Sequence, residues 1–184
     1  MAFIDTITDA DADEETAAMY RSEWERMGYV PNYTRIFGAR PDVYAAGRSL
    51  ATAIGSGMDN RRYELVTLAA ARQLRSTYCA LAHGSILRER FFDGDEVVKI
   101  ATDVEQSSLD EKDRAIMAYA ATVAADAGDV DQHLVDELRS HGMSDQEILD
   151  ITLAAAARCF FSTVLDALGV EADATYRETV EPEL

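Results

Sequence analysis

The sequence predicts an all-α protein of about eight helices that forms one domain over residues 1–184. Glycine (10) and proline (3) are scarce while alanine is abundant, a composition that favours helix over sheet. Apolar residues recur at helical spacing, and most of the segments that contain them begin at a capping residue or end at a glycine. No segment shows the apolar–polar alternation of a strand, and no repeat or low-complexity linker divides the chain.

Residues 1–90 predict an extended lead-in over 1–11, followed by four helices and one short helical turn. The first helix has acidic residues in its first turn and ends at Gly28. Met19, Tyr20 and Trp24 are expected to lie along one face of it. Asp59 and Ser76 are expected to cap the third and fourth helices. The expected helices span residues 11–27, 41–54, 59–74 and 77–90, with the helical turn starting at Pro31.

Residues 91–184 predict four more helices and an acidic tail. The last helix is the longest, and Ser144 with Glu147 three residues later forms a capping-box pattern at its start. This helix is apolar over much of its circumference, so we expect burial on several sides or a subunit interface. The tail over 170–184 is expected to fray or to drape over a neighbour. The expected helices are a short one within 91–103 and longer ones over 108–126, 131–141 and 144–168.

The composition excludes several classes of function. A net charge of −17 makes nucleic acid and anionic membrane surfaces poor partners. The first residues show no secretory signal, and no apolar run approaches the length that spans a membrane. Two cysteines do not make a disulfide framework, and we expect a cytoplasmic protein whose thiols stay reduced.

The residues with chemical potential gather between Glu64 and His83. Cys79 and His83 are one helical turn apart, so their side chains are expected on the same face. If Ser76 is the N-cap, its hydroxyl accepts from the backbone N–H of Cys79, and the thiol lies in the first turn, where the helix dipole favours an anion. A thiol, an imidazole and a carboxylate together are the components of an activated nucleophile.

Structural interpretations of the same residues stay open. Cys79 fits a buried, inert thiol, His83 a hydrogen-bonded structural histidine, and Glu64 an acid that serves the helix dipole. Cys159 lies among alanine and phenylalanine and is expected in the core. We expect no metal, because a zinc site needs three or four convergent ligands and no second Cys/His cluster is present.

The spacing of these residues resembles that of a known family. Eleven residues separate Glu64 from Ser76, two separate Ser76 from Cys79, and three separate Cys79 from His83. The order resembles the carboxymuconolactone decarboxylase and alkylhydroperoxidase D-like superfamily, where Glu and eleven residues precede Cys-x-x-Cys-x-x-x-His. The flanking segments extend this resemblance, to the peroxidase-related branch, over about residues 15–175. These segments are VPN at 30–32, the helix at Pro41, SLDEKDRAIMAYA and the segment from GMSDQEI to about residue 173.

The resemblance implies an all-helical homo-oligomer, a trimer or hexamer, that reduces peroxides without a cofactor. Cys79 matches the second cysteine of the family, and His83 and Glu64 match its proton relay. Tyr78 stands where hydroperoxidase members often have a further histidine. Ser76 replaces the first cysteine, so the local dithiol cycle is lost and an external thiol, or Cys159, must resolve an oxidised Cys79.

Two other functions fit the same residues. Decarboxylase members of the superfamily imply that Glu64 and His83 could act as general acid and base on a small organic acid, with Cys79 incidental. The replacement at Ser76 also fits a scaffold protein whose site has decayed. The expected substrate is therefore a hydroperoxide or an organic acid.

Overall fold

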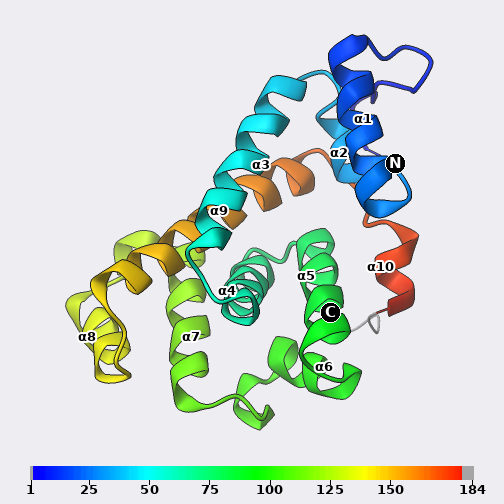
Figure 1. Cartoon of the computed structure of the whole chain (residues 1–184). Coiled ribbons are helices and arrows are strands. Elements are labelled where there is room, and N and C mark those ends of the chain that lie inside the picture. The colour runs from blue at the N-terminus through cyan, green and yellow to red at the C-terminus, as the bar shows by residue number, and fades with distance from the viewer. Residues whose placement is uncertain (1, 180–184) are drawn as a thin grey trace.

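The computed structural model describes residues 2–179, and within this range the regular structure is entirely helical. The all-α prediction is confirmed, although ten α-helices and two short 3-10 helices replace the expected eight (Figure 1). The elements are α1 Glu14–Met27, α2 Asn32–Ile36, α3 Pro41–Ser56, α4 Asn60–Gln73, α5 Thr77–Arg90, α6 Gly94–Thr102, η1 Val104–Gln106, α7 Glu111–Ala125, η2 Ala127–Asp129, α8 Gln132–Ser140, α9 Asp145–Ala167 and α10 Ala174–Thr179.

Helix α4 is the centre of the bundle and packs against α5, α7 and α9 (Figure 1). Its residues from Leu65 to Ala71 are all buried, and Leu65 and Leu68 are completely inaccessible to solvent. Burying apolar side chains on every side of one helix supplies most of the driving force for folding. The helix that carries Glu64 is therefore held by packing on several sides.

The predicted side-chain caps at Asp59 and Ser144 are confirmed. Asp59 accepts from the backbone N–H of Arg62 at 3.0 Å, and Ser144 and Glu147 form the expected capping box. Helix α7 begins later than predicted, because Asp110, and not Ser108, accepts from the backbone at its start. The N–H of Ser108 instead donates to the carboxylate of Glu96.

Helices α1, α2 and the start of α3 form an arm that leans away from the bundle (Figure 1). The predicted stripe on α1 is partly wrong: Tyr20 is buried and donates to the carbonyl of Ile7, whereas Trp24 is 61% exposed. Helix α1 packs mainly against α2 and α3, and its buried residues are Thr16, Tyr20 and Glu23.

The first part of the tail is ordered, contrary to the expectation that it frays or drapes over a neighbour. Asp173 is buried and accepts from the backbone N–H of Asn32 at 3.0 Å and from the hydroxyl of Tyr78. These bonds anchor α10 against α5 of the same chain. Residues 180–184, which the same expectation covered, lie outside the described residues.

The prediction that no apolar run approaches membrane-spanning length is wrong, because helix α9 is long and apolar enough by length and composition. Its contacts with α3, α4, α5, α7 and α8 give its apolar residues a place in the bundle instead. Leu149, Leu153 and Phe160 nevertheless stay 40–55% exposed at helical spacing. Burial of this helix on several sides is therefore confirmed, and a subunit interface at its exposed stripe stays a prediction.

Candidate functional site

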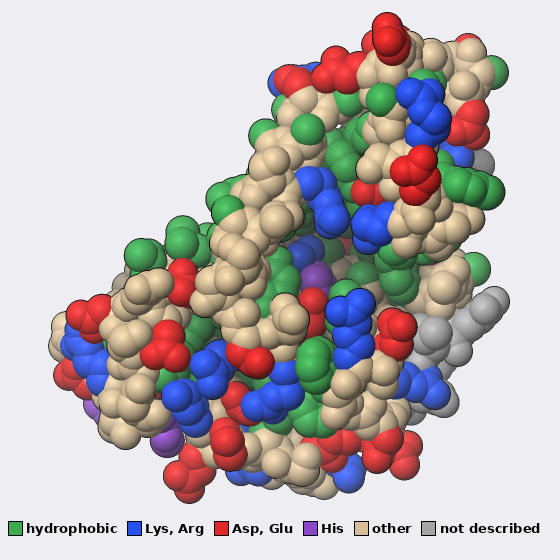
Figure 2. All heavy atoms as spheres, in the orientation of Figure 1, with side chains coloured by type: hydrophobic (Ala, Val, Ile, Leu, Met, Phe, Trp, Pro, Cys, Tyr) green, Lys and Arg blue, Asp and Glu red, His purple; other side chains and the backbone are tan. Residues whose placement is uncertain are grey.

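A cavity of about 760 Å³ opens between the arm and the bundle. Figure 2 shows the hollow, with basic and histidine side chains gathered in and around it. Glu64, Cys79 and His83 all line this cavity, as the helical spacing predicts for the last two. The structure thus brings the three candidate catalytic residues together; that they are catalytic stays a prediction. The wall includes six aromatic residues, which are Tyr33, Tyr44, Tyr63, Tyr78, Phe161 and Tyr176.

Glu64 and His83 are joined by a hydrogen bond of 2.6 Å between Oε2 and Nδ1. Both side chains are almost buried, at 12% and 11% exposure. Burial lowers the pKa of His83, the guanidinium of Arg158 lowers it further, and Glu64 opposes both. The imidazole is therefore neutral at pH 7. Because a carboxylate can only accept, Nδ1 donates to Glu64, and Nε2 remains as the basic nitrogen.

Cys79 is 2% exposed and faces a cation from another helix. Nη1 of Arg158, on α9, lies 3.5 Å from its Sγ. The same guanidinium lies 5.8 Å from the centre of the Phe161 ring. A guanidinium at this distance can pair with a thiolate, the form of cysteine that acts as a nucleophile.

Ser76 does not play the part predicted for it. It is the N-cap of α5, but its hydroxyl makes no capping bond to the N–H of Cys79. The hydroxyl donates instead to Oδ1 of Asp166 at 3.1 Å, and burial raises the pKa of that carboxyl. Ser76 is completely buried and does not line the cavity, and its side chain is directed to the carboxylate on α9.

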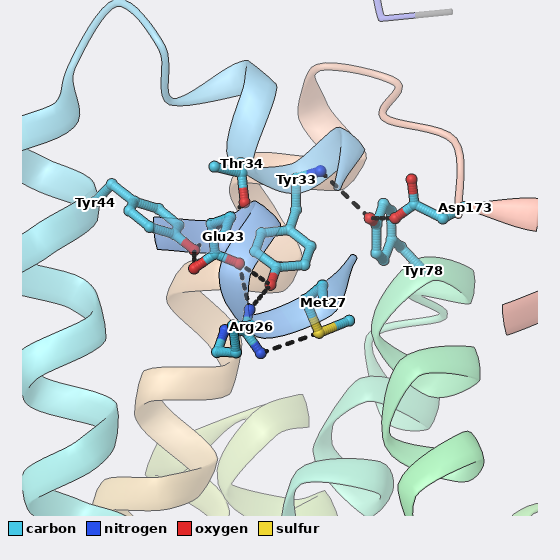
Figure 3. A network of polar contacts seen from close by, with 8 residues as sticks. All are labelled: Glu23, Arg26, Met27, Tyr33, Thr34, Tyr44, Tyr78 and Asp173. Carbon is cyan, nitrogen blue, oxygen red and sulfur yellow. Dashed lines mark hydrogen bonds and ion pairs between the residues drawn. The ribbon is translucent and has the colours of Figure 1, made fainter. Parts of the chain in front are cut away.

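Tyr78 lines the cavity but is held by the tail. Its hydroxyl donates to Oδ2 of Asp173 and accepts from the backbone N–H of Tyr33 at 3.3 Å (Figure 3). Burial and the bond to Asp173 raise its pKa, so it stays protonated. A tyrosine fixed in this way shapes the wall and cannot readily exchange protons with a substrate.

A second polar network fixes the arm side of the wall (Figure 3). Glu23 is 4% exposed and accepts from Tyr44 at 2.7 Å, from Tyr33 at 3.2 Å and from Arg26. Burial raises the pKa of both tyrosines. Two neutral phenols and one arginine therefore provide the hydrogen bonds that this buried carboxylate needs. The same bonds hold the two tyrosine rings in place.

Cys159 lies apart from this chemistry. It is half-buried on α9, does not line the cavity, and burial raises the pKa of its thiol. Both cysteines are free. Across residues 2–179, no group of three or more His, Cys, Asp or Glu side chains is arranged to hold a metal ion.

The main residue that sequence reasoning missed is Arg158. Its signal was a lone arginine within the apolar run LAAAARCFF, since a charged residue in a core helix is seldom buried without a partner. Its partner, Cys79, lies 79 residues earlier in the chain. Tyr33 and Tyr44 also line the cavity, and nothing in their spacing along the sequence points to it.

The comparisons with known proteins match this chain to one family model and to several solved structures. The model of the carboxymuconolactone decarboxylase family matches residues 97–173, a segment that follows His83. No curated protein matches the chain.

The solved structures share the fold at low sequence identity. An uncharacterized peroxidase-related protein from Ralstonia eutropha JMP134, with an alkylhydroperoxidase AhpD core, has a TM-score of 0.86 at 20% identity and covers 95% of this chain and 94% of its own. A second peroxidase-related protein, from Silicibacter sp. TM1040, has a TM-score of 0.85 at 21% identity, with 95% and 93% covered. The debrominase Bmp8 in complex with 2,3,4-tribromopyrrole has a TM-score of 0.80 at 18% identity, with 97% and 96% covered.

Proposed function

We propose that this chain, which matches the carboxymuconolactone decarboxylase family model over residues 97–173 and shares the fold of an alkylhydroperoxidase AhpD core, is a thiol-dependent enzyme that reduces a hydroperoxide at Cys79. One observation supports this above all: the Glu64–His83 bond and the Cys79–Arg158 contact meet at a single cavity. The cavity provides a nucleophile, a base and a fixed cation within an apolar enclosure.

The first step is oxidation of the thiol. Nε2 of His83 takes the proton of Cys79, while Glu64 stabilises the imidazolium and Arg158 the thiolate. The thiolate sulfur attacks the outer peroxide oxygen, so that an S–O bond forms as the O–O bond breaks. The departing alkoxide takes the proton back from His83. Peroxide and thiol thereby become an alcohol and a sulfenic acid.

The sulfenic acid must then be reduced by a thiol from outside the chain. Ser76 cannot form a disulfide, and Cys159 does not line the cavity. A first external thiol displaces water from the sulfenic acid and forms a mixed disulfide with Cys79. A second external thiol releases Cys79 and leaves as the symmetric disulfide.

A second candidate function is acid–base catalysis on a small organic acid. The Glu64–His83 bond favours it, because this pair is complete without the thiol. In that case Nε2 of His83 removes or delivers the proton of a decarboxylation or isomerisation, and Cys79 only packs. Cys79→Ser separates the two functions, since only the peroxidase loses all activity.

We further propose that the protein is a cytoplasmic homo-oligomer, a trimer or hexamer. The exposed stripe of Leu149, Leu153 and Phe160 on α9 supports assembly, since exposed apolar stripes are typical of subunit contacts. The charge of −17 supports the absence of nucleic-acid partners.

The deciding experiment follows the alkylation of Cys79 against pH, with and without cumene hydroperoxide. Cys159→Ser leaves Cys79 as the only thiol, and Cys79→Ser reports on Cys159 as the control. We expect rapid alkylation of Cys79 below about pH 7, together with a sulfenic acid that dimedone traps after peroxide treatment. A Cys79 that reacts as slowly as Cys159 and ignores peroxide would refute the peroxidase proposal.

A further inference from the structure

The charge of the cavity is opposite to that of the protein. The whole chain has 34 acidic and 17 basic residues. The charged part of the cavity lining contains only two glutamates against five arginines, which are Arg26, Arg48, Arg88, Arg90 and Arg158. A concave site with a positive lining in an acidic protein attracts anions, because low-dielectric walls focus the field.

Among the described residues, Arg26 is paired with Glu23, whereas the other four of these arginines form no ion pair. Arg48 and Arg158 are the two of them that lie on the long helices α3 and α9. The Nε–H of Arg158 is buried and has no hydrogen-bond acceptor within residues 2–179. A buried N–H without an acceptor is unfavourable, so a bound ligand that supplies an oxygen would relieve it.

Both arginines line the cavity, and so does Phe161. The guanidinium of Arg158 lies over the Phe161 ring. Gly47, the neighbour of Arg48 on α3, packs so closely on the same ring that an added Cβ would lie 3.0 Å from its Cζ. The wall therefore combines cations with a flat apolar surface, which suits a ligand with a planar body and a negative end.

We propose that the cavity selects an organic carboxylate with an aromatic body, whose carboxylate binds Arg48 and the Nε–H of Arg158. The cavity volume of about 760 Å³ suits such a ligand, since small-molecule sites measure roughly 300–1,000 Å³. Nη1 of Arg158 can keep its contact with Cys79 while Nε–H binds the ligand, because guanidinium donors point in fixed, separate directions. That the ligand also carries a hydroperoxide rests on the function proposed above.

The test compares cumene hydroperoxide with its para-carboxylated analogue as oxidants of Cys79, in the Cys159→Ser background. We expect the carboxylated peroxide to react about tenfold faster, as one charged hydrogen bond provides. Arg48→Gln should abolish this preference and Arg48→Lys should keep part of it. Arg21→Gln removes the same charge from the exposed surface of α1, outside the cavity lining, and should leave the preference unchanged.

A second measurement uses ligands that cannot react. We expect 4-isopropylbenzoate, but not 4-isopropylbenzamide, to slow the alkylation of Cys79 and to raise the melting temperature, and both effects should weaken in Arg48→Gln. Benzoate binding without any peroxide reaction would uphold this inference and refute the peroxidase. Equal rates for the two peroxides, with no protection by the benzoate, would refute this inference and leave the peroxidase standing. Binding of the benzoate that Arg48→Gln does not weaken would also refute it.

Discussion

Nδ1 of His83 lies 2.6 Å from Oε2 of Glu64, across the junction between helices α4 and α5. The chain reverses there through Arg75, whose φ of 59° is in the left-handed region. The reversal lays the helix with the carboxylate against the helix with the imidazole. The proton relay that the motif implies therefore depends on one tight turn as well as on residue spacing.

Replacing Glu64 by Gln should remove the negative charge that stabilises the imidazolium of His83. We expect the rate of Cys79 oxidation to fall by about 100-fold, the usual contribution of a positioned acid–base group. Stopped-flow measurement of sulfenic acid formation against pH tests this. Glu89→Gln, at an exposed glutamate that also lines the cavity, is the matched control, and an equal loss there would show that charge alone matters.

The stability of the protein should fall when pH is lowered through the unfolded pKa of histidine, about 6.5. Burial, and next the charge of Arg158, lower the pKa of His83 in the folded state. Between the two pKa values the unfolded chain binds the extra proton, so the free energy of unfolding decreases as pH decreases. Urea unfolding at several pH values measures this. In His83→Gln the slope of stability against pH over this interval should be smaller, and an unchanged slope would contradict the assignment.

Tyr78→Phe should loosen α10 without unfolding the bundle. The phenol connects Asp173 with the backbone of Tyr33, and its loss leaves Asp173 with the N–H of Asn32. We expect a loss of about 1–3 kcal/mol and faster proteolysis within α10. Tyr119→Phe removes a buried hydroxyl that faces Thr152 on α9, so it should destabilise the protein without exposing α10.

Ser76→Cys should rebuild an internal dithiol. The Cys-x-x-Cys spacing at a helix start places two sulfurs within reach of each other, so peroxide should yield an intramolecular disulfide with Cys79. Mass spectrometry without reductant would detect the loss of two hydrogens. Ser76→Ala controls for the lost hydrogen bond to Asp166 and should form no such disulfide. A trapped sulfenic acid in Ser76→Cys would show that the sulfurs do not meet.

Leu153→Glu should reduce the oligomeric state if the α9 stripe is a subunit interface. In an assembled oligomer the glutamate carboxylate would be buried in an apolar contact, which is unfavourable. In a monomer the same side chain would be exposed to water, so the fold itself should be little affected. Sedimentation velocity measures the mass. Ile4→Glu, at an equally exposed apolar residue near the N-terminus, should leave the mass unchanged. A wild-type mass in Leu153→Glu would place the interface elsewhere.

The sequence by itself determined the features that depend on neighbours along the chain. Asp59 and Ser144 cap their helices as predicted, because a cap bonds to backbone only three residues away. Cys79 and His83 share the cavity because one helical turn separates them. Glu64 could be named from its spacing in a family motif, although spacing alone did not show that it bonds directly to His83.

Only the tertiary structure decided the features that join distant segments. Arg158 reaches Cys79 across 79 residues, and Asp173 reaches Tyr78 across 95. Ser76 donates to Asp166, 90 residues away, and does not accept the bond from Cys79 N–H that local rules predicted. The physical reason is the same for all three contacts: a buried polar group bonds to a partner that packing brings within reach. The apolar periodicity of one helix does not specify which distant helix will pack against it.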